Sequence, residues 1–457
     1  MNRATPLRPR AERGADRTGL QRSLGPLFGV AVSVGSMIGV GVLRTPGIIL
    51  GHVGTPLLAW LTWIAGALYV LLCVNYMAEL AAAVPRSGGV YVFAARTLGP
   101  LGGTVVGWSD FLNSVFAIAL LAVALAEYIG ELIPQLSGAT GVVATLLIAT
   151  LTSLNLHGVR LASGAQQLTS LVKLTALWML AIACLVLTHP AASPITAFAT
   201  VSPVTLSAAG VIASFQLVLG AFNGWAAPAY FGGEATDSRR GVTRSLFYGA
   251  LLVSATYLAI NAAILYTVPP GELIASKLPA AAALERLTVA HGLGAGLGGT
   301  LFLLVAVLSL PSTLQAVMMQ TSRVLHAMSV DGLFPSWAAL VNQRGSPTNA
   351  TLVCGAIAML LATTSSFETL FVTFTVFAVL NNLILLCGVV RLRRTEPDLP
   401  RPYKVLGYPW LLLPIVVVDM IVFIGFASAN VRQCLFSAAL VAALYVAYRF
   451  HRRERRV

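Results

Sequence analysis

The sequence predicts an all-α integral membrane protein, and composition and the spacing of its apolar segments both support this class. Hydrophobic residues make up 57% of the 457 residues and charged residues only 10%, whereas soluble domains carry roughly 25% charged residues. The mean hydropathy is +0.83. Apolar runs close to the length of a membrane-crossing helix, about 20 residues, recur along the whole chain.

Windows of that length divide the chain into twelve predicted membrane spans. The predicted spans are residues 26–50, 56–83, 101–132, 141–157, 166–188, 206–231, 244–268, 297–328, 349–364, 368–390, 409–428 and 432–449. We therefore expect a basic tail at 1–25, a core at 26–390, a loop at 391–408, two further helices at 409–449 and a second basic tail at 450–457. An even number of spans returns both tails to the same side.

The basic residues predict the orientation of these spans. With the N-terminus in the cytoplasm, most of the 29 Lys and Arg fall in cytoplasmic loops and tails, as the positive-inside rule requires. We expect a multi-pass protein of the cell (inner) membrane with both termini cytoplasmic. The net charge of +13 is then explained by topology and contact with membrane lipid, without a nucleic-acid partner.

Motifs for catalysis, nucleotides and metals are absent from the sequence. The six histidines are scattered, and none of the five cysteines pairs at the spacing of a metal site. The sequence contains no P-loop and no His-Glu-x-x-His or Gly-x-Ser-x-Gly motif. We therefore expect neither an enzyme nor a cofactor, and the absence of a nucleotide motif favours secondary transport.

Two predicted spans are interrupted near their middle. The first contains Gly-Ser-Met-Ile-Gly-Val-Gly at 35–41, and the sixth contains Gly-Ala-Phe-Asn-Gly-Trp at 220–225 followed by Pro228. Non-helical backbone is tolerated within a membrane only where it is buried in protein or lines a cavity. Interrupted spans in corresponding halves of a chain indicate a substrate site at the membrane midplane. The alternative is that these glycines only allow close helix crossing.

Five segments, in order, resemble the amino acid–polyamine–organocation (APC) superfamily of transporters, and most closely the bacterial amino acid permeases related to L-type exchangers. The segments are 35–41, Met77-Ala-Glu-Leu with 85–92, Phe222-Asn-Gly-Trp with 233–240, Ser322-Arg-Val with 331–335 and 344–347, and 400–409. The resemblance implies a LeuT-like fold with five-plus-five inverted repeats, in which helices 1 and 6 are broken and helices 11 and 12 lie outside the repeats.

A broken helix offers both partners that an amino acid zwitterion needs. Amides at a half-helix N-terminus attract a carboxylate, and carbonyls at a half-helix C-terminus attract an ammonium. We expect the carboxylate at the amides near Ser36, Met37, Gly39, Val40 and Gly41. We expect the ammonium at the carbonyls near Gly35, Gly220, Ala221 and Phe222.

Residues that follow the second break are further candidates for contact with substrate. Phe222 or Trp225 would cover the substrate and Asn223 would hydrogen-bond to it or to the backbone, although Trp225 is equally explained as core packing. Gly220 stands where L-type exchangers often carry a bulky gating aromatic, which predicts a larger side-chain pocket. Asp110 and Asp419 are intramembrane carboxylates without an assigned role.

Lys173 is the candidate coupling residue. It lies within the fifth apolar span, and a lysine inside a span is costly enough to indicate a function. It resembles the fifth-helix lysine of the family, whose ammonium replaces the cation of sodium-coupled relatives. The alternative is a lysine that extends to the membrane interface.

Acidic residues at the predicted cytoplasmic ends of spans are candidate gate residues. Glu79, Glu234 and Asp331 recur with arginines in the segments that carry the resemblance. A salt-bridge network there would hold the inner side closed, whereas ordinary loop charges would contribute little.

The sequence therefore predicts a sodium-independent secondary transporter for amino acids, most simply neutral ones, that works by proton symport or by exchange. A transporter of polyamines or other organic amines, and a membrane sensor without transport, are the alternatives. Residues 134–141 contain no cysteine, so we expect no covalent heavy-chain partner of the kind that animal L-type exchangers carry.

Overall fold

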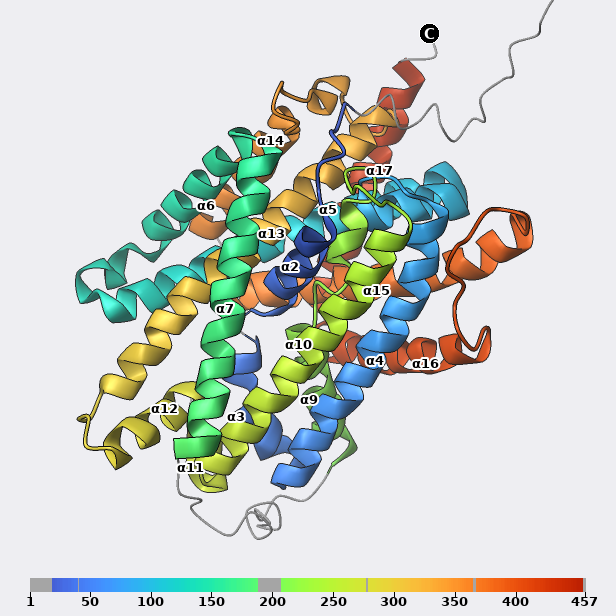
Figure 1. The fold of residues 1–457 in the computed structure, drawn as a ribbon. Coiled ribbons are helices and arrows are strands. Elements are labelled where there is room, and N and C mark those ends of the chain that lie inside the picture. The colour runs from blue at the N-terminus through green and yellow to red at the C-terminus, as the bar shows by residue number, and fades with distance from the viewer. Residues whose placement is uncertain (1–18, 40, 188–206, 277, 365–366, 455–457) are drawn as a thin grey trace, which may run out of the picture.

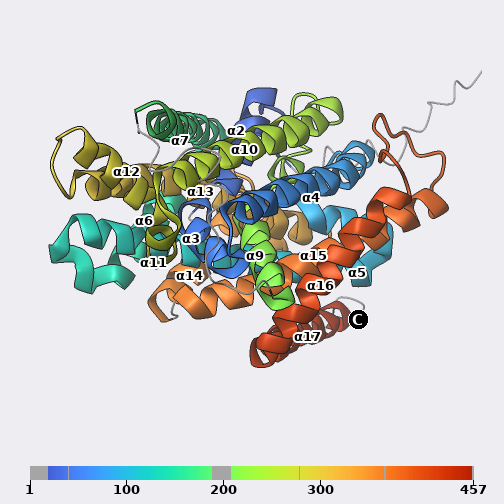
Figure 2. The same cartoon turned by 90° about the horizontal axis from the view of Figure 1, so that it is seen from below.

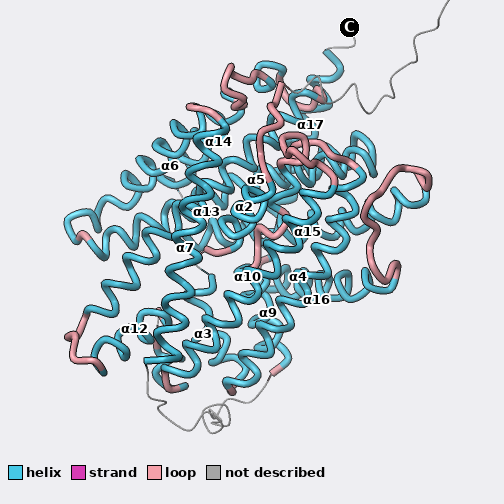
Figure 3. The backbone as a smooth tube through the Cα atoms, in the orientation of Figure 1, coloured by secondary structure: helices cyan, strands magenta, loops and turns pink. Residues whose placement is uncertain are grey.

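A computed structural model describes residues 19–39, 41–187, 207–276, 278–364 and 367–454 (Figure 1). Within these residues the chain is helical, and extended pairing is limited to two isolated bridges, Leu24 with Ala235 and Ser87 with Phe231 (Figure 3). The predicted all-α class is therefore confirmed. The outer parts of both basic tails and Val40 lie outside the described residues.

Helices follow one another with short connections. The α-helices are α2 (Pro26–Met37), α3 (Gly41–Val53), α4 (Pro56–Ala83), α5 (Gly89–Leu132), α6 (Thr140–Leu156), α7 (Val159–Leu187), α9 (Ala208–Ala221), α10 (Arg240–Thr267), α11 (Pro270–Ala275), α12 (Pro279–Ala290), α13 (Leu297–Val330), α14 (Thr348–Thr364), α15 (Phe367–Thr395), α16 (Leu413–Ala429) and α17 (Val431–Glu454). Short 3₁₀ helices are η1 (Pro134–Ala139), η2 (Ala227–Tyr230), η3 (Ser336–Ala339) and η4 (Trp410–Leu412).

The length and surface of the helices identify a multi-pass membrane protein. Among the described residues, six helices are long and apolar enough to cross a membrane, or seven if α2 and α3 form one bent span. Large apolar side chains such as Leu68, Leu146 and Met179 are exposed on them. A surface of this kind suits hydrocarbon rather than water.

Predicted and observed helix bounds agree best for the uninterrupted spans. α4 and α13 begin where predicted, at Pro56 and Leu297. α5 instead begins at Gly89, twelve residues before the predicted start, because a helix that precedes the span is joined to it at a kink. Gly99 has φ of 79° there and is followed by Pro100, so the normal helical hydrogen bonding is broken at this point.

Both predicted interruptions are breaks in the helices. The first predicted span contains α2 and α3, which are bent by 45° relative to each other. In the sixth predicted span, α9 ends at Ala221 and a turn with Gly224 at φ of 100° leads to η2. Gly224 is needed there because a side chain would be strained at this φ.

The first broken helix lies inside the bundle. α2 packs against α7, α10 and α13 (Figures 1 and 2), and α3 packs against α9, so the second break is adjacent to the first. α5 makes its broadest contacts with α13 and α15. α16 and α17 lie at one side of the bundle in Figure 2, where α16 contacts α15, α9 and α4.

Candidate functional site

The break between α2 and α3 is short and leaves carbonyl oxygens without amide donors. The amide of Ile38 still donates to Val34 O at 3.1 Å, and that of Gly39 donates to Met37 O at 2.9 Å. The carbonyls at the end of a helix have no intrahelical partners, so they must find donors elsewhere. Side chains of α7, α10 and α13 supply these donors.

Lys173 of α7 reaches into this break. Its side chain is buried, and Nζ lies 3.2 Å from Gly35 O, 2.6 Å from Ile38 O and 2.7 Å from Thr313 Oγ1. An ammonium has three N–H donors, so each donor has one acceptor. Thr313 in turn donates to Ile38 O at 2.8 Å. Lys173 therefore points into the bundle and not toward the membrane interface.

Tyr257 of α10 connects the two breaks. Its hydroxyl lies 2.6 Å from Met37 O and 2.8 Å from Ala221 O, at the last residue of α2 and of α9. A single O–H donates to one of these acceptors at a time. The ends of α2 and α9 thus both lie within hydrogen-bond distance of the Tyr257 hydroxyl.

Close backbone approaches also join the two breaks. A Cβ on Gly41 would lie 2.9 Å from Ala221 Cα, and a Cβ on Gly224 would lie 2.7 Å from Ser36 Cβ. Both distances are shorter than carbon atoms tolerate, so these two positions require glycine. The glycines that the sequence placed at the interruptions therefore serve helix contact as well as backbone freedom.

The residues predicted to donate amides are not equivalent. Ser36 and Met37 belong to the last turn of α2, where an amide donates to the carbonyl four residues earlier. Gly39 bonds to Met37 O, Val40 lies outside the described residues, and Gly41 is the first residue of α3. The first amides of α3 are thus the free helical donors next to the break.

The carbonyls predicted to accept an ammonium already have partners in three of four cases. Gly35 O binds Lys173, Ala221 O binds Tyr257, and Gly220 O accepts from the amide of Asn223 at 3.3 Å. Gly220 itself is exposed, and its Cβ position faces open space. A bound ammonium would therefore have to share these oxygens with the present donors.

The side chains after the second break pack in different surroundings. Phe222 is fully buried, with its ring 4.8 Å from that of Tyr257. Trp225 is half-buried, and its ring lies 5.9 Å from that of Tyr76 on α4. Asn223 Oδ1 accepts from the amide of Gly224 at 2.8 Å and so supports its own turn.

Glu234 forms a buried salt bridge near one end of the bundle. Arg323 of α13 holds it with two hydrogen bonds, Nε to Oε1 at 3.0 Å and Nη2 to Oε2 at 2.9 Å, and both side chains are at most 2% exposed. The backbone oxygen of Glu234 accepts from the amides of Ser23 and Leu24. This pair therefore fastens the loop after η2 to α13 and to the chain before α2.

Asp331, at the end of α13, lies in a separate ion pair. It accepts from Arg86 Nη2 at 3.0 Å and from the Tyr91 hydroxyl at 2.8 Å. The arginine and aspartate side chains are about one-third exposed, so solvent weakens this pair.

Glu79 is held by a third, separate group. Arg393 Nε donates to it at 2.9 Å and the amide of Val405 at 2.7 Å, while Arg401 lies 3.7 Å away. Burial, and then the charge of Glu79, raise the pKa of Tyr403 in the same loop. The structure therefore places the three predicted gate residues in three different ion pairs. Glu234 belongs to the loop that follows the second break, and the backbone of Arg86, the partner of Asp331, also lies against Gly232 of this loop.

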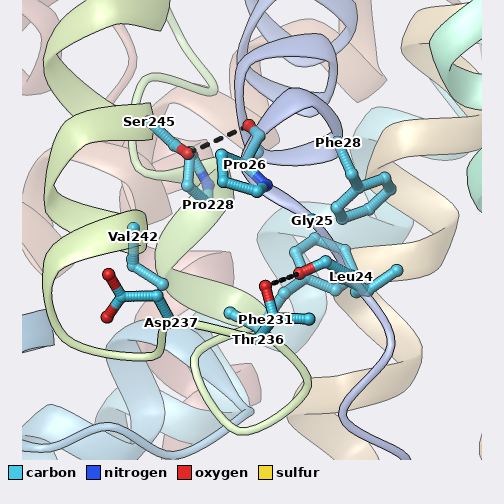
Figure 4. Close-up of a pocket in the computed structure, with 13 residues that line it drawn as sticks. Leu24, Gly25, Pro26, Phe28, Pro228, Phe231, Thr236, Asp237, Val242 and Ser245 are labelled. Carbon is cyan, nitrogen blue, oxygen red and sulfur yellow. Dashed lines mark hydrogen bonds between the residues drawn. The ribbon is translucent and has the colours of Figure 1, made fainter.

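A pocket opens beside the Glu234 loop, between the chain before α2, this loop and the start of α10 (Figure 4). Ser245 donates to Pro26 O at 3.3 Å and Thr236 to Leu24 O at 3.4 Å at its wall. Its lining is mostly apolar and shares no residue with the break between α2 and α3. This pocket is therefore distinct from the predicted substrate site.

Sequence reasoning missed two residues that contact the broken helices. Tyr257 joins the breaks, and Gln320 of α13 donates to the Ser36 hydroxyl. Each is one of several polar residues in a long helix, and the sequence does not show which of them faces a break.

The two interrupted helices contact each other, and a buried lysine holds the first break within a bundle of apolar helices. This arrangement defines a membrane protein of the broken-helix transporter class. Residues 24–448 match the model of the Amino acid permease family. The chain belongs to this family, and the predicted resemblance is confirmed.

Individual relatives are transporters by name. The chain is 27% identical over 315 residues to the serine/threonine exchanger SteT of Bacillus subtilis, with 68% of this chain and 69% of the relative covered. It is 28% identical to the human Asc-type amino acid transporter 1 (86% and 75% covered). It is 26% identical to the human large neutral amino acids transporter small subunit 2 (89% and 76% covered).

Proposed function

We propose that this protein is a secondary transporter that moves amino acids across the cell membrane by alternating access. The observation that carries the proposal is the ammonium of Lys173 on Gly35 O and Ile38 O, at the break between α2 and α3. A fixed cation at that position makes a sodium ion unnecessary. The names of the relatives support amino acids as substrates.

The proposed architecture has twelve spans in two inverted repeats of five, followed by α16 and α17. α2 with α3 would form span 1, and α9 with the turn and η2 would form span 6. The equivalent breaks in the two halves and their mutual contact support this arrangement. The basic tails and loops would face the cytoplasm, with both termini inside.

The proposed substrate site lies between the first turn of α3 and the end of α9. The carboxylate would bind the amides from Gly41 onward, and the ammonium would share the carbonyls of Gly35 and Ala221. The charge of Lys173 is already used by backbone oxygens. The proposed site therefore offers no other charged residue to the side chain of the substrate. A neutral amino acid is therefore favoured over arginine or a polyamine.

The Glu234–Arg323 pair is proposed as the inner gate. It joins the loop after the second break to α13, so opening the inner side would require this buried pair to separate. A membrane partner linked by a disulfide is not expected, because the loop at 134–141 contains no cysteine.

Uptake into proteoliposomes tests this proposal. Purified protein would be reconstituted with or without internal amino acids, and with or without an inward proton gradient, and presented with radiolabelled neutral amino acids, arginine and putrescine. Uptake that requires internal amino acid indicates an exchanger, and uptake driven by the gradient indicates a symporter. Uptake of putrescine alone would replace amino acids by amines as substrate, and no uptake of any label by folded protein would indicate a sensor.

A further inference from the structure

Four carboxyl side chains are buried among the described residues: Glu79, Asp110, Glu234 and Asp419. A buried carboxylate is costly unless hydrogen bonds or a counter-ion balance it. A group that lacks such partners avoids the cost by taking up a proton. The partners of each buried carboxyl therefore indicate whether it holds a charge or a proton.

Three of the four carboxyls are matched at both oxygens. Glu234 is held by Arg323, and Glu79 is held by Arg393 together with the amide of Val405. Neutral donors on Tyr69 and Asn382 serve the two oxygens of Asp419 on α16.

Asp419 accepts from the Tyr69 hydroxyl at Oδ1 and from Asn382 Nδ2 at Oδ2, the latter at 2.6 Å. The hydroxyl of Tyr76 donates to the other atom of the same amide, Asn382 Oδ1. Each carboxyl oxygen of Asp419 thus has a hydrogen-bond donor.

Asp110 of α5 differs from the other three. Its Oδ1 accepts from the Tyr230 hydroxyl at 2.9 Å, but its buried Oδ2 has no hydrogen-bond partner among the described residues. Asn113, three positions along the same face of the helix, carries a second buried acceptor without a partner, Oδ1. The unpaired donor in this stretch, Trp108 Nε1, is two positions from Asp110 and so lies on another face of the helix. A proton on Asp110 supplies a donor on the face that carries the two acceptors.

No described cation pairs with Asp110. Between Gly107 and Asp110, α5 touches α13, α15, η2 and Phe334 in the loop after α13. Their buried or half-buried titratable side chains are Arg323, His326, Arg393 and Tyr230. Arg323 and Arg393 are bound to glutamates, and His326 has interactions of its own, so Tyr230 alone hydrogen-bonds to Asp110.

Lys173 is not the better proton carrier, although it is the other isolated buried ionisable group. Its three ammonium protons each have an acceptor. After loss of one proton, the two remaining N–H groups would still serve Gly35 O and Ile38 O, but weaker neutral hydrogen bonds would replace the charge-assisted ones. At Asp110 an added proton instead provides a donor where a buried acceptor is unpaired.

We propose that Asp110 is a proton-binding site of this transporter and that Tyr230 sets how tightly the proton is held: the hydroxyl weakens proton binding while it donates to Oδ1, and its departure strengthens it. Tyr230 lies in η2, four residues before Glu234 of the inner gate. The proton is therefore exchanged together with movement of the loop that follows the second break. The inference rests on the proposed function and deepens it, because it makes transport dependent on pH through Asp110.

The first test compares the pH dependence of uptake for matched variants in proteoliposomes between about pH 5 and pH 9, a range that reports the essential titrating groups. The wild type should show a pH-dependent rate. Asp110→Asn, which keeps an oxygen for Tyr230, should give a flat profile, and Asp110→Glu should restore the dependence. Asp419→Asn is the control with a buried carboxyl that is already matched, and it should keep the shape of the wild-type profile.

Tyr230→Phe provides a second variant that keeps the carboxyl. It removes the donor to the ionised form, so the midpoint of the profile should move to higher pH. An unchanged midpoint, a pH-independent wild type, or a wild-type profile in Asp110→Asn would each overturn the proposal.

Infrared difference spectra of the purified protein provide a readout that does not need transport. A carbonyl band of a protonated carboxylic acid should be present in the wild type and in Asp419→Asn at neutral pH, and absent in Asp110→Asn. The same band in all three proteins would refute the assignment. Absence of uptake by the wild type with this band present would refute the proposed function and leave the proton site standing.

Discussion

Replacement of Lys173 by methionine tests the centre of the site. The change Lys173→Met keeps most of the length of the side chain and removes all three hydrogen bonds of the ammonium. Ile38 O keeps Thr313 as a donor, whereas the structure gives Gly35 O no side-chain donor other than Lys173 among the described residues. One buried acceptor is left unpaired, at a cost of about 1–3 kcal/mol, and charge-assisted bonds are lost at Ile38 O and Thr313.

Together these losses destabilise the conformation in which the break is held by about 3 kcal/mol. If transport needs this conformation, its population should fall by roughly 100-fold, since each 1.4 kcal/mol is a factor of ten. The initial rate of uptake should fall by the same factor. The assay is the initial rate of amino acid exchange in proteoliposomes, normalised to folded protein by size-exclusion chromatography.

Thr313→Val is the matched control, because it leaves Lys173 on both backbone carbonyls. It should cost about 1 kcal/mol and lower the rate by only about fivefold. A rate for Lys173→Met within about twofold of wild type, from protein that folds normally, would refute the assignment of Lys173 to the working site.

Four further changes test other parts of the structure. Gly41→Val forces a side chain against the end of α9 and should abolish uptake while the protein still reaches the membrane, as a surface-accessibility assay would show. Tyr257→Phe removes the donor shared by the two helix ends and should lower thermal stability by about 1 kcal/mol with a larger loss of uptake. Glu234→Gln leaves the buried charge of Arg323 unbalanced and should lower the free energy of unfolding by about 3–5 kcal/mol. The double variant Glu234→Gln with Arg323→Met should recover part of this loss, as thermal unfolding would show. Backbone amide donors, that of Gly296 first, lower the pKa of Glu285. Glu285 therefore stabilises the loop before α13 at pH above the ordinary glutamate range, and this stabilisation is lost as pH falls through the lowered pKa. Glu285→Gln should remove the acid-side increase in hydrogen exchange of this loop.

The breaks in the helices were predictable because glycine clusters are anomalous within apolar spans. Gly41 and Gly224 lie at close approaches where no larger residue fits, and both belong to the glycine clusters that the sequence shows. Lys173 was predictable for a similar reason, since a charge inside a span must be balanced.

What the sequence could not specify is the set of partners opposite each break. Tyr257 and Gln320 act on residues more than 200 positions away, and nothing in their local sequence distinguishes them from packing residues. The separation of Glu79, Glu234 and Asp331 into three ion pairs was hidden for the same reason. All three share a charge type and a predicted side of the membrane, but each binds a different arginine: Glu79 binds Arg393, Glu234 binds Arg323 and Asp331 binds Arg86.

The two glycine contacts have a mechanical consequence. Gly41 against Ala221 and Gly224 against Ser36 connect the broken helices at two separate points. Two points of contact between rod-like elements suppress rotation of one about the other. Any motion that exposes the site would then carry both interrupted helices together as a single rigid body, and the helices around them would have to supply the surface on which that body turns.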